Sequence, residues 1–112
     1  MTREPGGTNI GEKLRLLLLH EEMDALTETM LMFAARCEHI QTIIKPKLAQ
    51  GITVVSDRFT DATYAYQAGG KGVDARSIDV LKSLVQKDLD PDLTFLFDVP
   101  VEISIERLKD TR

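Results

Sequence analysis

Apolar and polar positions follow two different periods along the chain. Two short apolar runs rich in β-branched and aromatic residues, at 52–57 and 93–98, each end in an acidic residue. Runs of this length and composition are typical of buried strands. Elsewhere apolar residues recur every three or four positions, which predicts helices. We expect these helices around residues 10–18, at 26–50, at 61–68, at 74–87 and from Pro100 onward.

The order of these elements predicts the fold class. Strands separated by helices imply parallel crossovers, and therefore an α/β fold, a three-layer sandwich built on a parallel sheet. Two strands do not make a stable sheet of this kind. Met1 and Thr2 are too short to supply another strand ahead of the first helix. We therefore expect residues 1–112 to form a single partial domain, with sheet elements missing at one or both ends.

Composition limits the classes of function. The 112 residues carry a net charge of −4, so no overall basic field favours nucleic acid as a partner. The chain shows neither a signal peptide nor an apolar run long enough to span a membrane, so we expect no membrane partner. The single cysteine, Cys37, fits a reducing compartment and therefore a cytoplasmic protein.

Asp57 and Arg58 are the first candidates for chemistry. They follow the first predicted strand, at the carboxyl end where open α/β sheets bind their ligands. The guanidinium of Arg58 suits a phosphate, and Asp57 can hold that guanidinium or assist with a metal. The alternative is a structural Asp–Arg pair that ends the strand.

The loop at residues 2–9 contains Arg3, Glu4 and Pro5 followed by two glycines. Glycine and proline predict a tight loop whose backbone can approach a ligand closely. Thr8 or Asn9 is suited to cap the helix that follows.

The long predicted helix at 26–50 is apolar around much of its surface. Such a helix is either buried on several sides or forms a subunit contact. Pro46 should kink it or start a new turn.

Arg36 interrupts the most apolar section of this helix and needs a partner, because burial of an unpaired charge is costly. The partner is either a ligand or a carboxylate, with Glu28, Glu38 and Asp57 as candidates. We interpret His39 as a polar helix residue without a metal role, since no second ligand stands at a suitable spacing.

Lys71 lies within a glycine-rich stretch but does not complete a phosphate-binding loop. The pattern G-x-x-x-x-G-K-[ST] requires glycine at position 65 and serine or threonine at position 72, where this chain has Ala65 and Gly72.

Several motifs together resemble the bacterial thymidylate kinase family, P-loop enzymes that phosphorylate dTMP with ATP. The similarity covers nearly the whole chain. Its motifs are the loop Thr2-Arg-Glu-Pro-Gly-Gly-Thr8, Phe33-Ala-Ala-Arg36, Asp57-Arg58-Phe59 with Thr63 and Tyr66-Gln67, the glycine-rich loop after it, and Pro91-Asp92-Leu93.

The resemblance implies roles for residues of a nucleoside monophosphate site. Arg36 corresponds to the arginine that hydrogen-bonds thymine, and Arg58 and Arg15 correspond to phosphate binders. Arg58 and Asp57 are the implied catalytic residues. The remaining implied contacts to dTMP come from Arg3, Glu4, Pro5, Met32, Phe33, Thr63, Tyr66 and Gln67.

Thr63 and Gln67 would contact the imide and methyl edge of the base. The aromatic ring that stacks on thymine usually stands four residues before the arginine. This chain has Met32 there and Phe33 next to it, and either side chain is a candidate to cover the base.

The family's P-loop should lie before residue 1, and its arginine-bearing lid and adenine site after residue 112. The resemblance therefore implies a P-loop NTPase-like fold, incomplete in this chain, with ATP and Mg²⁺ bound mainly outside it. The chain would supply the dTMP site, remain inactive alone, and dimerise through residues 26–50. The alternatives are a non-catalytic nucleotide-binding fragment and another P-loop nucleoside or nucleotide kinase.

Overall fold

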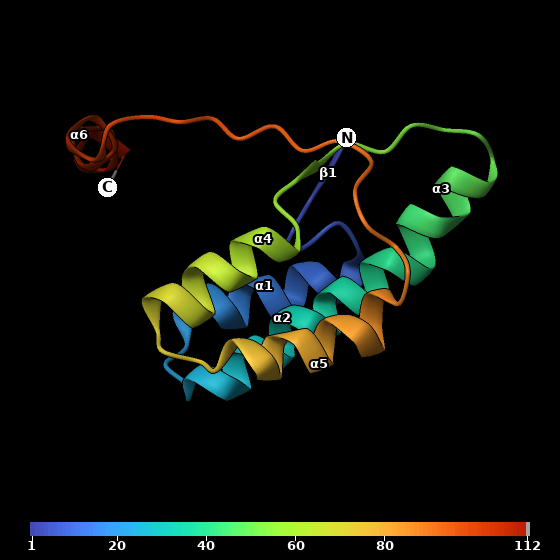
Figure 1. Cartoon of the computed structure of the whole chain (residues 1–112), viewed down its shortest axis with the longest axis horizontal. Helices are drawn as coiled ribbons and strands as arrows, with labels where there is room; N and C mark the ends of the chain where they lie inside the picture. The colour runs from blue at the N-terminus through green and yellow to red at the C-terminus, as the bar shows by residue number, and fades with distance from the viewer. Residues whose placement is uncertain (112) are drawn as a thin grey trace.

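The computed structural model describes residues 1–111 and contains a small parallel sheet above a layer of helices (Figure 1). Strand β1 (Thr2–Arg3) pairs with β2 (Ser56–Asp57), with Thr2 opposite Ser56 and Arg3 opposite Asp57. The prediction that Thr2 is too close to the chain start for a strand is wrong. Two backbone bonds extend the pairing beyond these residues, from Thr2 N to Val55 O at 2.8 Å and from Glu4 N to Asp57 O at 3.0 Å.

All the predicted helices are present. The long helix at 26–50 is one continuous helical rod whose middle widens into a π-helical turn just before Pro46. The elements are α1 (Asn9–His20), α2 (Ala25–His39), the π-helical turn η1 (Ile40–Ile44), α3 (Lys45–Ala49), α4 (Thr60–Thr63), a second π-helical segment η2 (Tyr64–Gly70), α5 (Ala75–Gln86) and α6 (Val101–Thr111).

Short polar side chains define where three of these helices begin. Thr8 accepts a hydrogen bond from the amide of Gly11 at 2.8 Å, Asp24 from Leu26 at 3.0 Å and Asp74 from Arg76 at 2.9 Å. Each bond satisfies an amide that has no partner inside the helix.

Helix α2 is the centre of the molecule, because α1 and α5 both pack against it (Figure 1). The buried apolar residues come mainly from this helix and its continuation. They are Phe33, Ala35, Ile40 and Ile44, with Ile78 from α5. Its outer side stays in solvent, where Leu26 and Met30 are 45% and 50% exposed. No helix in residues 1–111 is both long and apolar enough to cross a bilayer.

The two predicted buried strands are largely wrong. Only Ser56 and Asp57 of the first run are in a strand, and Val55 is 56% exposed. Residues 93–98 have no regular structure and Phe97 is 92% exposed. A strand needs a neighbour for its backbone groups and a layer to cover its side chains. In the described part of the chain the sheet consists of β1 and β2 alone, so residues 52–54 and 93–98 have no partner strand.

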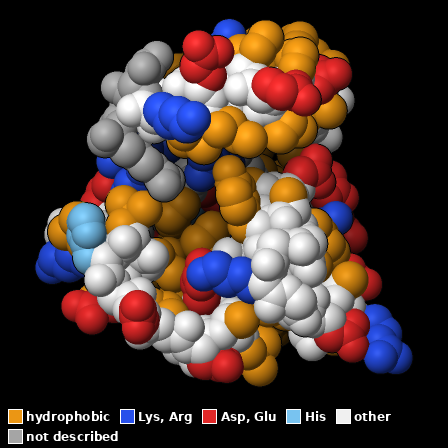
Figure 2. Space-filling view, turned by 90° about the vertical axis from the view of Figure 1, so that its left-hand side faces the viewer, with side chains coloured by type: hydrophobic (Ala, Val, Ile, Leu, Met, Phe, Trp, Pro, Cys, Tyr) orange, Lys and Arg blue, Asp and Glu red, His pale blue; other side chains and the backbone are white. Residues whose placement is uncertain are grey.

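The second run crosses the molecule as an extended segment and leads to α6, which lies apart from the other helices (Figure 1). Hydrophobic side chains line the hollow between α6 and the helices below it (Figure 2). The apolar residues of α6 are accordingly about half exposed, with Ile103 at 41% and Ile105 at 50%.

Candidate functional site

The loop between β1 and α1 turns back tightly toward α2. Its glycines adopt positive φ angles, 138° at Gly6 and 83° at Gly7, and the Glu4–Pro5 peptide bond is cis. A Cβ atom on Gly7 would lie 2.6 Å from Nε2 of His39. Only glycine allows both this backbone conformation and this approach.

Glu4 leads into this loop, and its carboxylate is buried between two side chains of α2. Oε1 of Glu4 lies 2.5 Å from Nε of Arg36, and Oε2 lies 2.7 Å from Nδ1 of His39. Nε2 of His39 lies 2.7 Å from the Thr2 hydroxyl. A carboxylate only accepts, so Nδ1 of His39 donates to it. Thr2, His39, Glu4 and Arg36 form a continuous network, in which Thr2 is half-buried and the other three side chains are buried.

This network corrects two sequence-based interpretations. The partner of Arg36 is Glu4, and none of Glu28, Glu38 and Asp57 pairs with it in the described structure. The sheet brings Glu4 to α2 from 32 positions away, which local spacing does not reveal. His39 is fully buried and belongs to the same network. His39 lies three residues after Arg36 on the same helix face, and this spacing could have indicated that the two side chains share a partner.

Two aromatic rings lie close to the guanidinium of Arg36. Its central carbon lies 4.8 Å from the ring centroid of Phe33 and 5.3 Å from that of Phe59. Cation–π contacts at these distances are attractive and strengthen as water is excluded. Phe33 is buried against Arg36, whereas Met32 is partly exposed.

Three buried polar atoms have no hydrogen-bond partner within residues 1–111. They are Nη1 of Arg36, Oγ1 of Thr63 and Oε1 of Gln67. Most buried polar atoms in folded proteins are paired, and each unpaired one needs an explanation. All three belong to residues that the resemblance assigns to the base, so the predicted base contacts coincide with unmet hydrogen-bonding capacity.

Gln67 is held from behind by Glu28 of α2. Nε2 of Gln67 donates to Oε1 of Glu28 at 3.1 Å, and Nζ of Lys71 lies 2.5 Å from the other oxygen, Oε2. Because the carboxylate takes the amide nitrogen, the free atom of Gln67 is its oxygen.

The side chains of Asp57 and Arg58, at the end of β2, have different surroundings. Arg58 has a φ of 68°, a backbone conformation that residues other than glycine rarely adopt and that often marks functional sites. Its guanidinium carbon lies 5.4 Å from the ring centroid of Tyr66. No ion pair joins Asp57 and Arg58 in residues 1–111, so the expectation that Asp57 holds this guanidinium is wrong.

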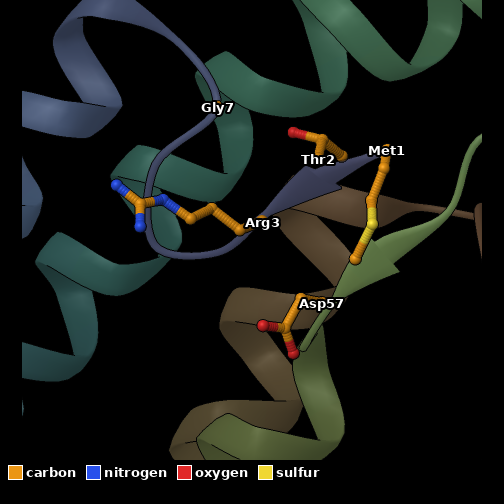
Figure 3. Close-up of a pocket in the computed structure, with 5 residues that line it drawn as sticks. All are labelled: Met1, Thr2, Arg3, Gly7 and Asp57. Carbon is orange, nitrogen blue, oxygen red and sulfur yellow. The ribbon is translucent and has the colours of Figure 1, made fainter.

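Asp57 instead lines an open hollow of about 410 Å³ beside the two strands (Figure 3). Thr2, Arg3, Gly7 and Met1 complete the lining. The side chain of Arg3 points away from Asp57 across this region (Figure 3).

The two other predicted arginines contact the protein itself. Arg3 pairs with Glu12 at 2.9 Å, and Arg15 donates to the carbonyl of Pro5 at 3.0 Å. The hydrogen bond between Arg3 and Glu12 raises the pKa of Arg3 and lowers the pKa of Glu12, whose carboxylate also accepts from the amide of Gly7. These contacts hold the loop between β1 and α1 in place.

No group of three His, Cys, Asp or Glu side chains in residues 1–111 is placed to hold a metal ion.

Comparison with known proteins gives consistent results. The family model described as thymidylate kinase matches residues 1–112. The chain is 64% identical over 111 residues to a thymidylate kinase of Methylobacillus flagellatus, covering 99% of this chain and 55% of that protein. It is 58% identical over 111 residues to one of Cupriavidus pinatubonensis, with the same two coverages. The chain thus spans about half the length of these relatives.

Among solved structures, the chain is similar to the crystal structure of thymidylate kinase from Ehrlichia chaffeensis. The TM-score is 0.84 at 45% identity, covering 97% of this chain and 62% of that chain. This similarity confirms the α/β fold class predicted from the order of elements, and the P-loop NTPase type that the resemblance implies.

Proposed function

The chain belongs to the thymidylate kinase family, and from that premise we propose that the protein transfers the γ-phosphate of ATP to dTMP. Residues 1–112 would supply the dTMP site as a partial domain, and ATP with Mg²⁺ would bind mainly to elements outside them. Such a kinase works in the cytoplasm, which suits a chain with a single free thiol, Cys37.

The observation that carries the proposal is the set of three buried atoms without partners. Nη1 of Arg36 is a donor and Oε1 of Gln67 is an acceptor, while the hydroxyl of Thr63 can be either. Thymine presents carbonyl oxygens on both sides of an imide N–H. A base of this pattern meets the donor with a carbonyl and the acceptor with its N–H.

The spacing of these residues places them along one seam. Phe59, Thr63 and Gln67 recur every four residues, as do Glu28, Met32 and Arg36 on α2. Gln67 meets Glu28 at one end of the seam and Phe59 meets Arg36 at the other. By this pairing, Thr63 stands opposite Met32, whose flexible thioether is suited to cover a flat base.

Arg58 is the candidate for the phosphate. In the described part of the chain its guanidinium lies over the ring of Tyr66, a contact that leaves its N–H donors available to an anion. Arg15, tied to the loop through Pro5, is the second candidate, and Asp57 at the strand end completes the catalytic assignment.

We also propose that the protein is a homodimer through the helical rod of residues 25–49. Leu26 and Met30 form an exposed apolar row on α2, and the exposed Ala34 continues it at the same spacing. A two-fold contact would bury this row against its own copy.

The test is an assay of ATP-dependent phosphorylation with protein expressed from its complete reading frame. We expect ADP formation that depends on dTMP, and none from residues 1–112 alone. Faster turnover of another nucleoside monophosphate would favour a different P-loop kinase. Binding of dTMP without turnover under all conditions would favour a non-catalytic binding module.

A further inference from the structure

Glu28 is the most informative residue that the proposed site does not yet use. Its carboxylate is largely enclosed, with 14% of the side chain exposed, although it lies near the start of α2. In the described structure its carboxylate bonds neither the network around Glu4 nor a backbone amide at the start of the helix. Its two oxygens are shared between Gln67 and Lys71.

An amide side chain such as Gln67 can present either of two faces to a ligand. When the amide nitrogen faces away from the ligand, the amide oxygen faces the ligand and accepts a hydrogen bond from it. When the amide is rotated by a half-turn, the nitrogen faces the ligand and donates instead. An ionised carboxylate has no proton to give, so it tolerates only the nitrogen on its side. The bond of 3.1 Å between Nε2 of Gln67 and Oε1 of Glu28 therefore selects one face.

The atom that this choice leaves for the ligand is Oε1 of Gln67, which is buried and unpartnered in the described structure. Turning the amide over would bring Oε1 against the Glu28 carboxylate, two acceptors in contact inside the protein. That arrangement is strongly unfavourable, because a buried acceptor without a donor loses its hydration uncompensated.

We propose that Glu28 is a positioning residue that determines base specificity. It acts through Gln67: by holding the amide nitrogen, it keeps the amide oxygen facing the base. The site then accepts a base with an N–H at this point and rejects one with a ring nitrogen acceptor, as in cytosine. This inference rests on the proposed function and adds to it a residue outside the base contacts.

Lys71 offers a matched control. It pairs with the other oxygen of Glu28 and is itself 52% exposed. Lys71→Met removes that ion pair but leaves the bond from Gln67 to Glu28. If the amide orientation is what matters, this variant keeps the base preference of the wild type.

The experiment measures dissociation constants of dTMP, dUMP and dCMP for protein expressed from its complete reading frame. Glu28→Gln keeps the size of the side chain but pairs with either face of Gln67. We expect the ratio of dTMP to dCMP affinity to fall about tenfold, the effect of one mismatched buried hydrogen bond. The ratio of dTMP to dUMP should not change, because these bases share the same hydrogen-bonding edge.

A double variant separates positioning from general loss of structure. In a Gln67→Leu background the amide is gone, so adding Glu28→Gln should change the dTMP to dCMP ratio no further. An equal loss for all three nucleotides in Glu28→Gln would overturn the inference and leave a purely structural role. If the wild type discriminates by base and Glu28→Gln keeps that preference, only this inference fails. If the wild type binds none of them, the proposed function fails as well.

Discussion

The carboxylate of Glu4 lies 2.5 Å from Nε of Arg36, and both side chains are almost completely buried. Glu4 also accepts from His39, so one carboxylate fixes two side chains of α2. With Nε committed to Glu4, the unpartnered Nη1 of Arg36 is the donor left for another molecule. The ion pair thus joins the loop after β1 to the face of α2 for which we propose base recognition.

Removing Glu4 should destabilise the protein strongly. Glu4→Ala leaves the guanidinium of Arg36 buried without its counter-charge, and loss of one partner from a buried pair costs about 3–5 kcal/mol. The measurement is the free energy of unfolding in urea. The double variant Glu4→Leu with Arg36→Met should lose less than Glu4→Ala, because no buried charge remains. Glu22→Ala, at an exposed position, is the control, and equal midpoints for Glu4→Ala and Glu22→Ala would contradict the prediction.

Tyr64 of η2 should contribute stability that disappears at high pH. Its hydroxyl donates to the Asp79 carboxylate of α5, and this bond is the main reason that the pKa of Tyr64 rises from 10.0 to about 12. A raised pKa in the folded state means that the stabilisation is complete below pH 10 and is lost as pH rises toward 12.

The check for Tyr64 compares urea unfolding of the wild type and Tyr64→Phe across this pH window. The wild type should be the more stable protein at neutral pH, and the difference should shrink above the ordinary tyrosine pKa. Asp79→Asn removes the carboxylate that raises the pKa, so the tyrosinate absorbance of this variant should appear at lower pH. A wild-type advantage independent of pH would rule out the proposed linkage.

The helices could be predicted from the sequence because their determinants are local. Apolar residues at helical spacing marked α1, α2 and α5, and Asp74 stands at the start of α5 as its capping position requires. The strands could not be predicted from the sequence, because burial of a strand depends on its neighbours. Residues 93–98 have the composition of a buried strand, yet no described strand pairs with them.

In the candidate site, too, the features that depend on local sequence could be predicted and the long-range contacts could not. Arg36, Thr63 and Gln67 were named from motifs, and their unpartnered atoms agree with that assignment. The partners that orient them were not predicted, because Glu4 lies 32 positions from Arg36 and Glu28 lies 39 positions from Gln67. A contact of this range exists only once the sheet and helices have assembled.

A charge in the exposed apolar row of α2 should separate the proposed dimer. Met30 is 50% exposed, and Met30→Glu would place a carboxylate in the two-fold contact. Burial of an unpaired charge costs several kcal/mol, so we expect a monomer in sedimentation velocity at about micromolar concentration. Ser83→Glu, at an exposed position on α5, should leave the dimer intact. A wild-type protein that sediments as a monomer would refute the dimer itself.

Arg36 and Arg58 should separate recognition of the base from recognition of the phosphate. Thymidine and dTMP share the base, and only dTMP has the phosphate. Arg58→Ala should therefore weaken dTMP far more than thymidine. A charge-assisted hydrogen bond contributes roughly 1.5–3 kcal/mol, which corresponds to about a tenfold to hundredfold loss of affinity.

The substitution at Arg36 has to keep a positive charge next to Glu4, because the two side chains form a buried ion pair. Arg36→Ala would leave that carboxylate buried alone and lose stability before it reports on binding. Arg36→Lys keeps a cation for Glu4 but has no second nitrogen in place of Nη1. We expect it to weaken thymidine and dTMP by the same factor, measured by calorimetric titration beside a thermal melt.

Lys47→Ala is the control for a change in overall charge, since α3 lies far from α4 (Figure 1). It should alter neither affinity. Equal losses for thymidine and dTMP in Arg58→Ala would show that this arginine does not bind the phosphate. In that case the guanidinium over Tyr66 has a structural part at the end of β2, and Arg15 becomes the remaining candidate for the phosphate.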